Sequence, residues 1–335
     1  MRNIKHLLVL GGSFAIALAL VNESKAQKLE MSDKPAFQPS ELQKFTGARL
    51  STSIRNGTSL PSQLIPRNQV PNNYRIPKSK LTLLVRNQGD CGACTSFAAC
   101  GALQVAIMKA KPQSVVMPGD YYKNVIRGDC ETGYNTWKMV QNLENKGVPT
   151  VPLSRSPAVL ASGAGVTAKA SRVGYVTDKE EMRRILASGY PLVADYSITP
   201  LWSTYKAGIW SESTAQQEYK ALVRLFPRLT PIFQSGIAGG HAVLIVGYFK
   251  PGVYRVSEFS GAVKQAAKTL PQLDITFRLD HGVWVCQNSW GKDWGDNGYF
   301  YIVESEPTGQ GRDPIDDYAY WVEGAEFYRG NQRIE

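Results

Sequence analysis

Three separated segments of the chain carry side chains that could together perform nucleophilic catalysis. Cys94 follows the turn-rich segment Asn87–Ala93 and opens a predicted helix, whose first-turn N–H groups and dipole favour a thiolate. A thiolate nucleophile needs a base, and His241 begins the apolar strand that continues through Ala242–Tyr248. Asn288 offers an amide oxygen that can hold an imidazole in one tautomer. The residue types therefore predict a nucleophile, a base and an orienting group.

Each of these side chains also has a purely structural interpretation. A cysteine is often a small buried apolar residue, and we prefer this interpretation for Cys100 and Cys286. Cys91 and Cys94 have the Cys-x-x-Cys spacing of a redox pair, but that pairing explains neither the remaining cysteine nor the histidine segment. His241 could equally be a hydrogen-bonded histidine of the core.

The elements that must position these side chains change type along the chain. Apolar periodicity and capping signals predict helices over 94–110, 136–146 and 178–187. Short β-rich runs separated by Gly, Pro and Asn predict strands over 192–198, 242–248, 284–288 and 299–303. A helical first half followed by a stranded second half indicates an α+β protein with two lobes. Two stretches of unassigned role, 212–238 (with a helix expected over 215–226) and 250–282, interrupt the stranded half.

Taken in order, the three segments resemble those of the papain-like cysteine peptidases. Gln88-Gly-Asp-Cys-Gly-Ala-Cys94 is similar to the family's nucleophile segment. His241-Ala-Val-Leu-Ile-Val-Gly-Tyr248 and Asn288-Ser-Trp-Gly are similar to the segments that carry its histidine and its asparagine. Weaker likenesses at Pro191-Leu-Val-Ala, at 202–209 and at Asn73-Tyr-Arg75 extend the resemblance over about residues 71–303. Three motifs in the same order are much more specific than one.

The resemblance implies a catalytic role for each matching residue. Cys94 is expected as the nucleophile and His241 as the general base and acid. Asn288 is expected to orient the imidazole, and Gln88 to donate its side-chain amide to the oxyanion. The residues expected to line the substrate groove are Gly133, Tyr134, Asp195, Gly240 and Trp290, of which the tryptophan would also shield the His–Asn hydrogen bond from water.

Three further expectations come from the same resemblance. Cys91 and Cys130 should form a disulfide that joins the nucleophile loop to a glycine-containing loop. Thr95 stands where the family usually carries a tryptophan, so a large packing surface between the lobes is missing. An acidic Asp195 in the main side-chain pocket would favour Arg or Lys two positions before the cut, unless its carboxylate faces solvent or pairs with a lysine.

The N-terminal part of the chain has the pattern of an export signal. Basic residues precede an apolar run over 7–21, and the small residue Ala26 follows at the expected cleavage point. The run of about 15 residues is shorter than the roughly 20 that a membrane-spanning helix needs, which disfavours a membrane anchor. Residues 1–26 are thus predicted to be a signal peptide, and the protein to be secreted or periplasmic.

The remaining chain is expected to contain two parts. Residues 27–70 are polar and Pro-rich, and we expect them either to lie across the groove as a propeptide that is removed or to brace the structure. Residues 71–335 would form the peptidase domain, with a helical lobe at about 81–188 and a β-rich, barrel-like lobe at about 189–335. The active site would lie between the lobes.

The amino-acid composition is consistent with a globular peptidase domain, and it also reduces the classes of partner that we expect. The 335 residues are 43% hydrophobic and 20% charged, which is typical of a globular protein and not of a disordered one. The net charge is +10, but no run of basic residues interleaved with aromatics indicates nucleic-acid binding. We expect a monomer that acts on proteins or peptides, uses no metal or organic cofactor, and has no membrane contact after signal removal.

Two other functions remain open beside a secreted cysteine endopeptidase. One is a catalytically silent relative that binds peptides or a host protein. The other is a thiol amidase or acyltransferase that uses the same residues on a non-peptide amide.

Overall fold

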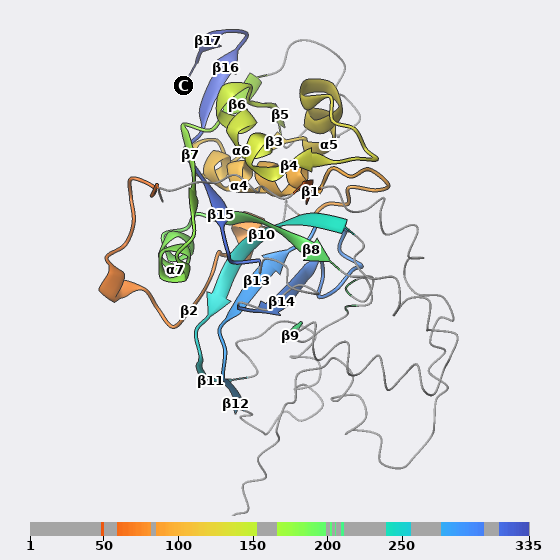
Figure 1. The fold of residues 1–335 in the computed structure, drawn as a ribbon. Helices are drawn as coiled ribbons and strands as arrows, with labels where there is room; N and C mark the ends of the chain where they lie inside the picture. Colours follow the sequence, from red (N-terminus) through yellow and green to blue (C-terminus); the bar gives the residue numbers. More distant parts are fainter. Residues whose placement is uncertain are drawn as a thin grey trace, which may run out of the picture.

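The computed structural model describes residues 48–49, 59–81, 85–152, 166–198, 202, 205, 209–210, 239–255, 276–304 and 315–334 (Figure 1). The predicted signal peptide and the helix expected over 215–226 lie outside these residues. Within the described ranges, no helix is long and apolar enough to cross a membrane. The same ranges contain no group of His, Cys, Asp and Glu side chains that could hold a metal ion.

The described elements alternate between short helices and strands. The helices are η1 (Arg67–Gln69), α3 (Lys78–Leu81), α4 (Cys94–Ala110), α5 (Pro118–Asp120), η2 (Tyr121–Ile126), α6 (Thr136–Asn145) and α7 (Lys179–Ala187). The strands up to the middle of the chain are β1 (Ala48–Arg49), β2 (Asn73–Arg75), β3 (Ser114–Val116), β4 (Tyr134–Asn135), β5 (Val148–Pro152), β6 (Val166–Lys169), β7 (Arg172–Val176) and β8 (Leu192–Ile198). The later strands are β9 (Ile209–Trp210), β10 (Gly239–Phe249), β11 (Gly252–Arg255), β12 (Thr276–Leu279), β13 (Val283–Gln287), β14 (Tyr299–Val303), β15 (Ala319–Glu323), β16 (Glu326–Arg329) and β17 (Gln332–Arg333).

The larger sheet is built around β10. Its strands follow the order β7-β15-β8-β10-β13-β14-β9, and β2 also pairs with β10. The partners β8, β13 and β2 all run antiparallel to β10. Every residue of β13, and of β10 from His241 onward, is buried, so both faces of the sheet centre are covered. Continuous apolar runs, instead of an apolar–polar alternation, are expected for such a doubly covered strand.

Helix α4 connects the sheet to the smaller helical region. It packs on β8, β10 and β15 on one side, and on α6 and β3 on another (Figure 1). Small residues make this close approach feasible: a Cβ atom added at Gly101 would lie 3.0 Å from Leu244 Cδ2 of β10. The smaller sheet, in the order β17-β16-β6-β5-β3, completes the helical side.

The predicted α+β class is confirmed, and several elements have the predicted bounds, among them α4, β8 and β14. Helix α7 begins as predicted, because the Asp178 side chain caps it by accepting a hydrogen bond from the Glu181 N–H at 2.8 Å. Strand β10 includes His241 as predicted, but it begins two residues earlier, at Gly239.

Strand pairing and packing join segments from the two sides of the predicted lobe boundary near residue 189. Strand β7 pairs with β15, and α7 buries Met182, Ile185 and Leu186 in the same cluster as β8, so both elements belong with the larger sheet. Conversely, β16 returns to the helical side and pairs with β6. The predicted boundary reflects a change in local residue type, whereas these pairings join segments that are far apart in the chain.

Residues 59–72, which we call the strap, run along the outside of α7 and β15 (Figure 1). Their backbone is fastened at both ends and in the middle: Trp321 Nε1 donates to Ser59 O (2.8 Å), Arg184 Nε to Ile65 O (2.7 Å), and Lys250 N to Asn72 O (2.8 Å). The Arg67–Glu181 ion pair (2.7 Å) adds a further contact. The strap is therefore a part of the folded body.

The backbones of β10 and β2 approach each other closely at Gly247. A Cβ atom added at Gly247 would lie 2.4 Å from the carbonyl oxygen of Tyr74 in β2. This oxygen belongs to the backbone, so it cannot move away without a substantial cost in free energy. We expect Gly247→Ala to lower the free energy of unfolding by about 2–3 kcal/mol, as measured by urea denaturation. Gly119→Ala is the matched control, because nothing lies within 4 Å of its added Cβ, and equal midpoints would contradict the prediction.

Candidate active site

The structure places Cys94 as the first residue of α4, at the helix N-terminus. Its side chain is 0% exposed and belongs to no disulfide. The preceding loop is held by the disulfide between Cys91 and Cys130, and Gly92 N donates to Cys130 O at 2.9 Å. The expected pairing of these two cysteines is confirmed, and the alternative redox pairing with Cys94 is not the one formed. The helix N-terminus favours the thiolate form of a cysteine placed there.

His241 and Asn288 lie in direct contact, as the sequence predicts. His241 Nε2 is 2.7 Å from Asn288 Oδ1, and the same oxygen accepts the backbone N–H of Ser289 at 2.8 Å. An oxygen that accepts both bonds requires a hydrogen on Nε2, so a neutral ring leaves Nδ1 unprotonated. Nδ1 is buried and has no hydrogen-bond partner among the described residues. The ring is therefore held in the tautomer that can take up a proton at Nδ1.

Aromatic side chains enclose the imidazole. The ring centroids of Trp290 and Trp202 lie 5.1 Å and 5.3 Å from that of His241, and the two indoles are 5.0 Å apart in an edge-to-face arrangement. Trp290 is 5% exposed, and the shielding of the His–Asn bond expected for this residue agrees with its position. Trp294 and Phe300 extend the same cluster, and both contact Trp202.

This enclosure determines the charge of the ring. Burial lowers the pKa of His241 from 6.5 to about 4, and the hydrogen bond to Asn288 offsets a part of that effect. The imidazole is thus neutral at pH 7 as long as it stays covered. A neutral imidazole is the form that acts as a general base.

The nucleophile loop is bonded to the asparagine segment. Gln88 N donates to Ser289 O (2.8 Å), Gly291 N donates to Arg86 O (3.0 Å), and Asn87 forms an antiparallel bridge with Trp290. The Gln88 side chain takes part: its Nε2 donates to Cys91 O at 2.8 Å, and its Oε1 accepts from the hydroxyl of Ser289. Both ends of the Gln88 amide are therefore bonded, to the nucleophile segment at Cys91 and to the asparagine segment at Ser289.

The residues expected along the substrate groove lie on three elements. Gly133 is buried, has a φ of +66° and precedes Tyr134 of β4, whose hydroxyl accepts from Asn142 Nδ2 at 3.2 Å. Asp195 of β8 is 4% exposed and pairs with Ala242 in the register of β10. Gly240 of β10 immediately precedes His241. Directly paired residues of neighbouring strands point to the same face, so Asp195 and Ala242 share a face of the sheet.

Two residues next to the site were not singled out from the sequence. Trp202 covers one side of His241, and Ser289 bonds the Gln88 amide. Both residues belong to segments that resemble the family, which is a usable signal, but the residue type alone does not indicate that the Ser289 hydroxyl bonds Gln88. Thr95, at the position of the missing tryptophan, is 0% exposed, and its Oγ1 has no hydrogen-bond partner among the described residues.

The other two cysteines differ from Cys94 in their place in the fold. Cys100 and Cys286 are 0% exposed, as Cys94 is, but Cys100 lies inside α4 and Cys286 lies in β13, so neither begins a helix. Burial raises the pKa of Cys100 to about 12, and burial together with nearby Asp316 raises the pKa of Cys286 well above its ordinary value. Both thiols therefore stay protonated and unreactive, as a structural role in the core implies.

The fold and the site together indicate a class of protein. An α+β fold that presents a cysteine at a helix N-terminus and a histidine bonded to an asparagine is suited to nucleophilic catalysis by a thiol. A model of the papain family cysteine proteases matches residues 70–226 and 230–314. The chain belongs to this family.

Curated relatives and solved structures give the same result. The chain is 23% identical to cathepsin B-like CP3 of Giardia intestinalis over 74% of each chain, and 22% identical to mouse cathepsin K over 79% of this chain and 69% of that protein. In fold it is similar to procathepsin B S9 of Trypanosoma congolense, with a TM-score of 0.56 at 17% identity, over 85% of this chain and 89% of the other. It is also similar to procathepsin L 3 of the Tenebrio molitor larval midgut, with a TM-score of 0.50 at 14% identity, over 85% and 77% of the two chains.

The lowered pKa of His241 gives a prediction for stability. An unfolded chain binds a proton at this ring near pH 6.5, whereas the folded chain does so only near pH 4. The stabilisation from keeping the ring neutral is therefore complete above about pH 6.5 and is lost as the pH falls towards 4, by an amount on the order of 3 kcal/mol. Urea denaturation of a Cys94→Ala background between pH 4 and 8 measures this slope.

Two variants separate His241 from other titrating groups. His241→Gln should flatten the slope between pH 6.5 and 4, while His281→Gln, at an exposed position, should keep it. If both variants keep the same slope as the parent, the assignment to His241 is wrong.

Proposed function

We propose that the protein is an endopeptidase in which Cys94 is the nucleophile and His241 is the base. The observation that carries this proposal is the bond between His241 Nε2 and Asn288 Oδ1, which leaves Nδ1 as a buried proton acceptor without a hydrogen-bond partner among the described residues. The position of Cys94 at the first turn of a helix that packs on β10 supports it. A signal-like N-terminus further supports export to the periplasm or the medium.

The proposed reaction has two stages. The Cys94 thiol gives its proton to His241 Nδ1, and the thiolate attacks the carbonyl carbon of the substrate peptide bond. The side-chain amide of Gln88 and the backbone N–H of Cys94 would stabilise the oxyanion, and His241 would return the proton to the leaving amine. Water then attacks the thioester while His241 accepts its proton, and the carboxylate product leaves with Cys94 regenerated.

Part of the N-terminal segment is proposed to block this reaction. Strand β1 pairs in parallel with β4, with Ala48 opposite Tyr134, and it also contacts β10. Extended peptides bind proteins by adding a strand to an exposed edge, so β1 would occupy the edge that a substrate needs. The complete burial of Cys94 and His241 supports a covered form of the enzyme.

Unlike β1, the strap is proposed to remain in the active enzyme. Its backbone bonds to Trp321, Arg184 and Lys250 would all have to break before a peptidase could hold it in extended form. Leu60, Leu64 and Val70 also pack against the buried cluster of the larger sheet. The segment 27–70 would thus be divided into a removable part before Ser59 and a permanent brace after it.

The first test concerns the nucleophile. Cys94→Ala should reduce casein hydrolysis at least about a thousandfold, because no other group replaces the attacking sulfur. An epoxide peptide inhibitor should label Cys94 in the activated wild type, and intact-protein mass spectrometry should show a single adduct. Labelling of Cys100 or Cys286, or full activity of the variant, would refute the assignment. Cleavage of simple amides but not of casein would identify an amidase instead.

A second test concerns substrate preference. We propose that the Asp195 carboxylate selects Arg or Lys two positions before the cut, since it lies on β8 opposite Ala242, next to His241. Asp195→Asn should lower kcat/KM for such substrates about tenfold or more and change it little for substrates with Leu at that position. Asp90→Asn, at an exposed position, is the matched control. A wild-type library profile that contains only aliphatic or aromatic residues there would contradict the proposal.

A third test concerns processing. N-terminal sequencing of the active species should find a start before Ser59 and after Arg49. A chain that begins at Asn73 should lose stability relative to one that begins at Ser59, because the Arg67–Glu181 pair and the backbone bonds are gone. An active species that starts near Gln27 would refute removal, and one that starts near Asn73 would refute retention of the strap.

A further inference from the structure

The loop of residues 129–133 carries the edge of the chain on which β1 lies. It follows η2 and leads directly into β4, and β1 pairs in parallel with β4. The disulfide at Cys130 holds one point of the loop next to the nucleophile segment. Asp129, Glu131 and Thr132 are exposed, so burial does not determine the shape of the loop. Its hydrogen bonds therefore set the direction of the edge.

Asp129 is the centre of these hydrogen bonds. Its carboxylate accepts the backbone N–H of Glu131 at 2.9 Å and the hydroxyl of Thr132 at 2.7 Å. Its carbonyl oxygen accepts the backbone N–H of Gly133 at 2.9 Å, in an isolated antiparallel bridge between the two residues. Hydrogen bonds to an ionised carboxylate are stronger than those to a neutral acceptor, so the Asp129 side chain holds the loop closed.

A buried tyrosine of η2 connects the loop to the core. Tyr122 is 0% exposed, and its hydroxyl donates to the carbonyl oxygen of Asp129 at 2.8 Å. The backbone of Gly128 lies against the same ring, because a Cβ atom added there would overlap the ring, and Gly128 N donates to Tyr122 O at 2.9 Å. The position of Asp129 is therefore fixed relative to the core, and not only relative to its own loop.

These bonds decide which backbone groups can pair with an extended segment. The Gly133 N–H is already bonded within the loop, so it is not available to a segment that lies along the edge. The pairing of β1 agrees with this, because its two residues lie opposite Tyr134 and Asn135. A preformed edge binds an extended segment more tightly than an unformed one, because no conformational entropy is lost in ordering it.

We propose that Asp129 is a positioning residue for extended segments, and that Thr132 and Tyr122 hold it in place. With the loop closed, the backbone of Tyr134 and Asn135 forms a ready edge, for β1 in the covered form and for a peptide substrate after β1 is removed. The role towards a substrate rests on the proposed peptidase function, whereas the role towards β1 does not. Asp129 acts through the loop and does not touch the reacting bond.

The first measurement is amide hydrogen exchange of β1 in the full chain with Cys94→Ala, which needs no enzymatic activity. Thr132→Val keeps the shape of the side chain but removes the hydroxyl, so exchange at Ala48 and Arg49 should become about threefold to tenfold faster. Thr132→Ser keeps the hydroxyl and should exchange as the parent does. Asp129→Ala removes both side-chain bonds and should speed the exchange at least as much as Thr132→Val.

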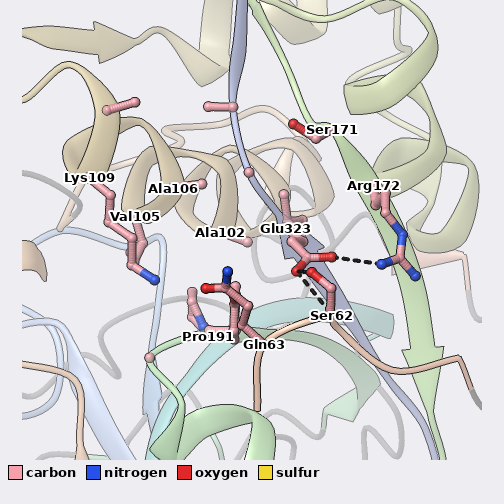
Figure 2. A pocket seen from close by; sticks show the side chains of 16 residues that line it. Ser62, Gln63, Ala102, Val105, Ala106, Lys109, Ser171, Arg172, Pro191 and Glu323 are labelled. Atoms are coloured by element: carbon pink, nitrogen blue, oxygen red, sulfur yellow. Dashed lines mark hydrogen bonds and ion pairs between the residues drawn. The ribbon is translucent and has the colours of Figure 1, made fainter.

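Ser62→Ala is the matched control, because it removes another hydroxyl–carboxylate bond at a distant position. The Ser62 hydroxyl donates to Glu323 beside a cavity of about 490 Å³ that lies between the strap and the second half of α4 (Figure 2). This variant should leave the exchange of β1 unchanged. Equal exchange of β1 in the parent and in Thr132→Val would overturn the proposal. So would an equal acceleration in β1 and β13, which would indicate a general loss of stability.

The second measurement is steady-state kinetics of the activated wild-type chain and its variants, corrected for active enzyme by titration with an epoxide inhibitor. For substrates with three residues before the cut, Thr132→Val should raise KM about threefold to tenfold and leave kcat unchanged. Substrates with one residue before the cut should be unaffected. Tyr122→Phe keeps the ring against Gly128 and should raise KM in the same way.

The outcomes separate this proposal from the proposed function. A fall in kcat with an unchanged KM, or an equal effect on short and extended substrates, would overturn the positioning role of Asp129. If the wild type shows no hydrolysis that depends on Cys94, the proposed function fails, and the exchange of β1 alone decides whether Asp129 positions the edge.

Discussion

The bonds between residues 86–88 and 289–291 are the constraint on which the rest of the site depends. Cys94 and Gln88 come from the helical side of the molecule, whereas His241 and Asn288 come from the larger sheet. The Gln88–Ser289 and Gly291–Arg86 backbone bonds hold the two sides in one register, and the packing of α4 on β10 fixes the distance between them. Catalysis by positioned groups tolerates displacements of only about 1 Å, so in the proposed reaction these bonds matter as much as the side chains of Cys94 and His241.

The enclosure of His241 and the cover over Cys94 act together. Burial next to Trp202 and Trp290 disfavours the imidazolium form of His241. In the proposed reaction, proton transfer from the Cys94 thiol would have to create this imidazolium. A covered site is thus unreactive for two reasons: the imidazolium is disfavoured electrostatically, and the buried thiol is inaccessible to substrate. Admission of water or substrate would raise the proton affinity of the ring and favour the thiolate at the same moment.

Local features of the fold could be predicted from the sequence, and non-local ones could not. The cap at Asp178, the helix at Cys94 and the strand at Tyr299 depend on residues within a few positions of one another, and their signals are present in short windows. The three segments that resemble the papain family could be recognised because each is contiguous. The strap contacts, the return of β16 to β6 and the position of Ser289 depend on pairs separated by more than a hundred residues, or on an ordinary hydroxyl. The pairings that cross the predicted lobe boundary near residue 189 are non-local in the same way.

The disulfide next to the nucleophile has a chemical consequence for handling the protein. Cys94 reacts only as a reduced sulfur, whereas three residues before it Cys91 must stay oxidised to hold the loop that leads to Gly133. The proposed reaction therefore requires two opposite redox states three residues apart, and both can exist only where the bridge is harder to reduce than the oxidised forms of Cys94. Strong reductants would keep Cys94 reduced but would also loosen the loop, so the protein is suited to a narrow range of redox potential.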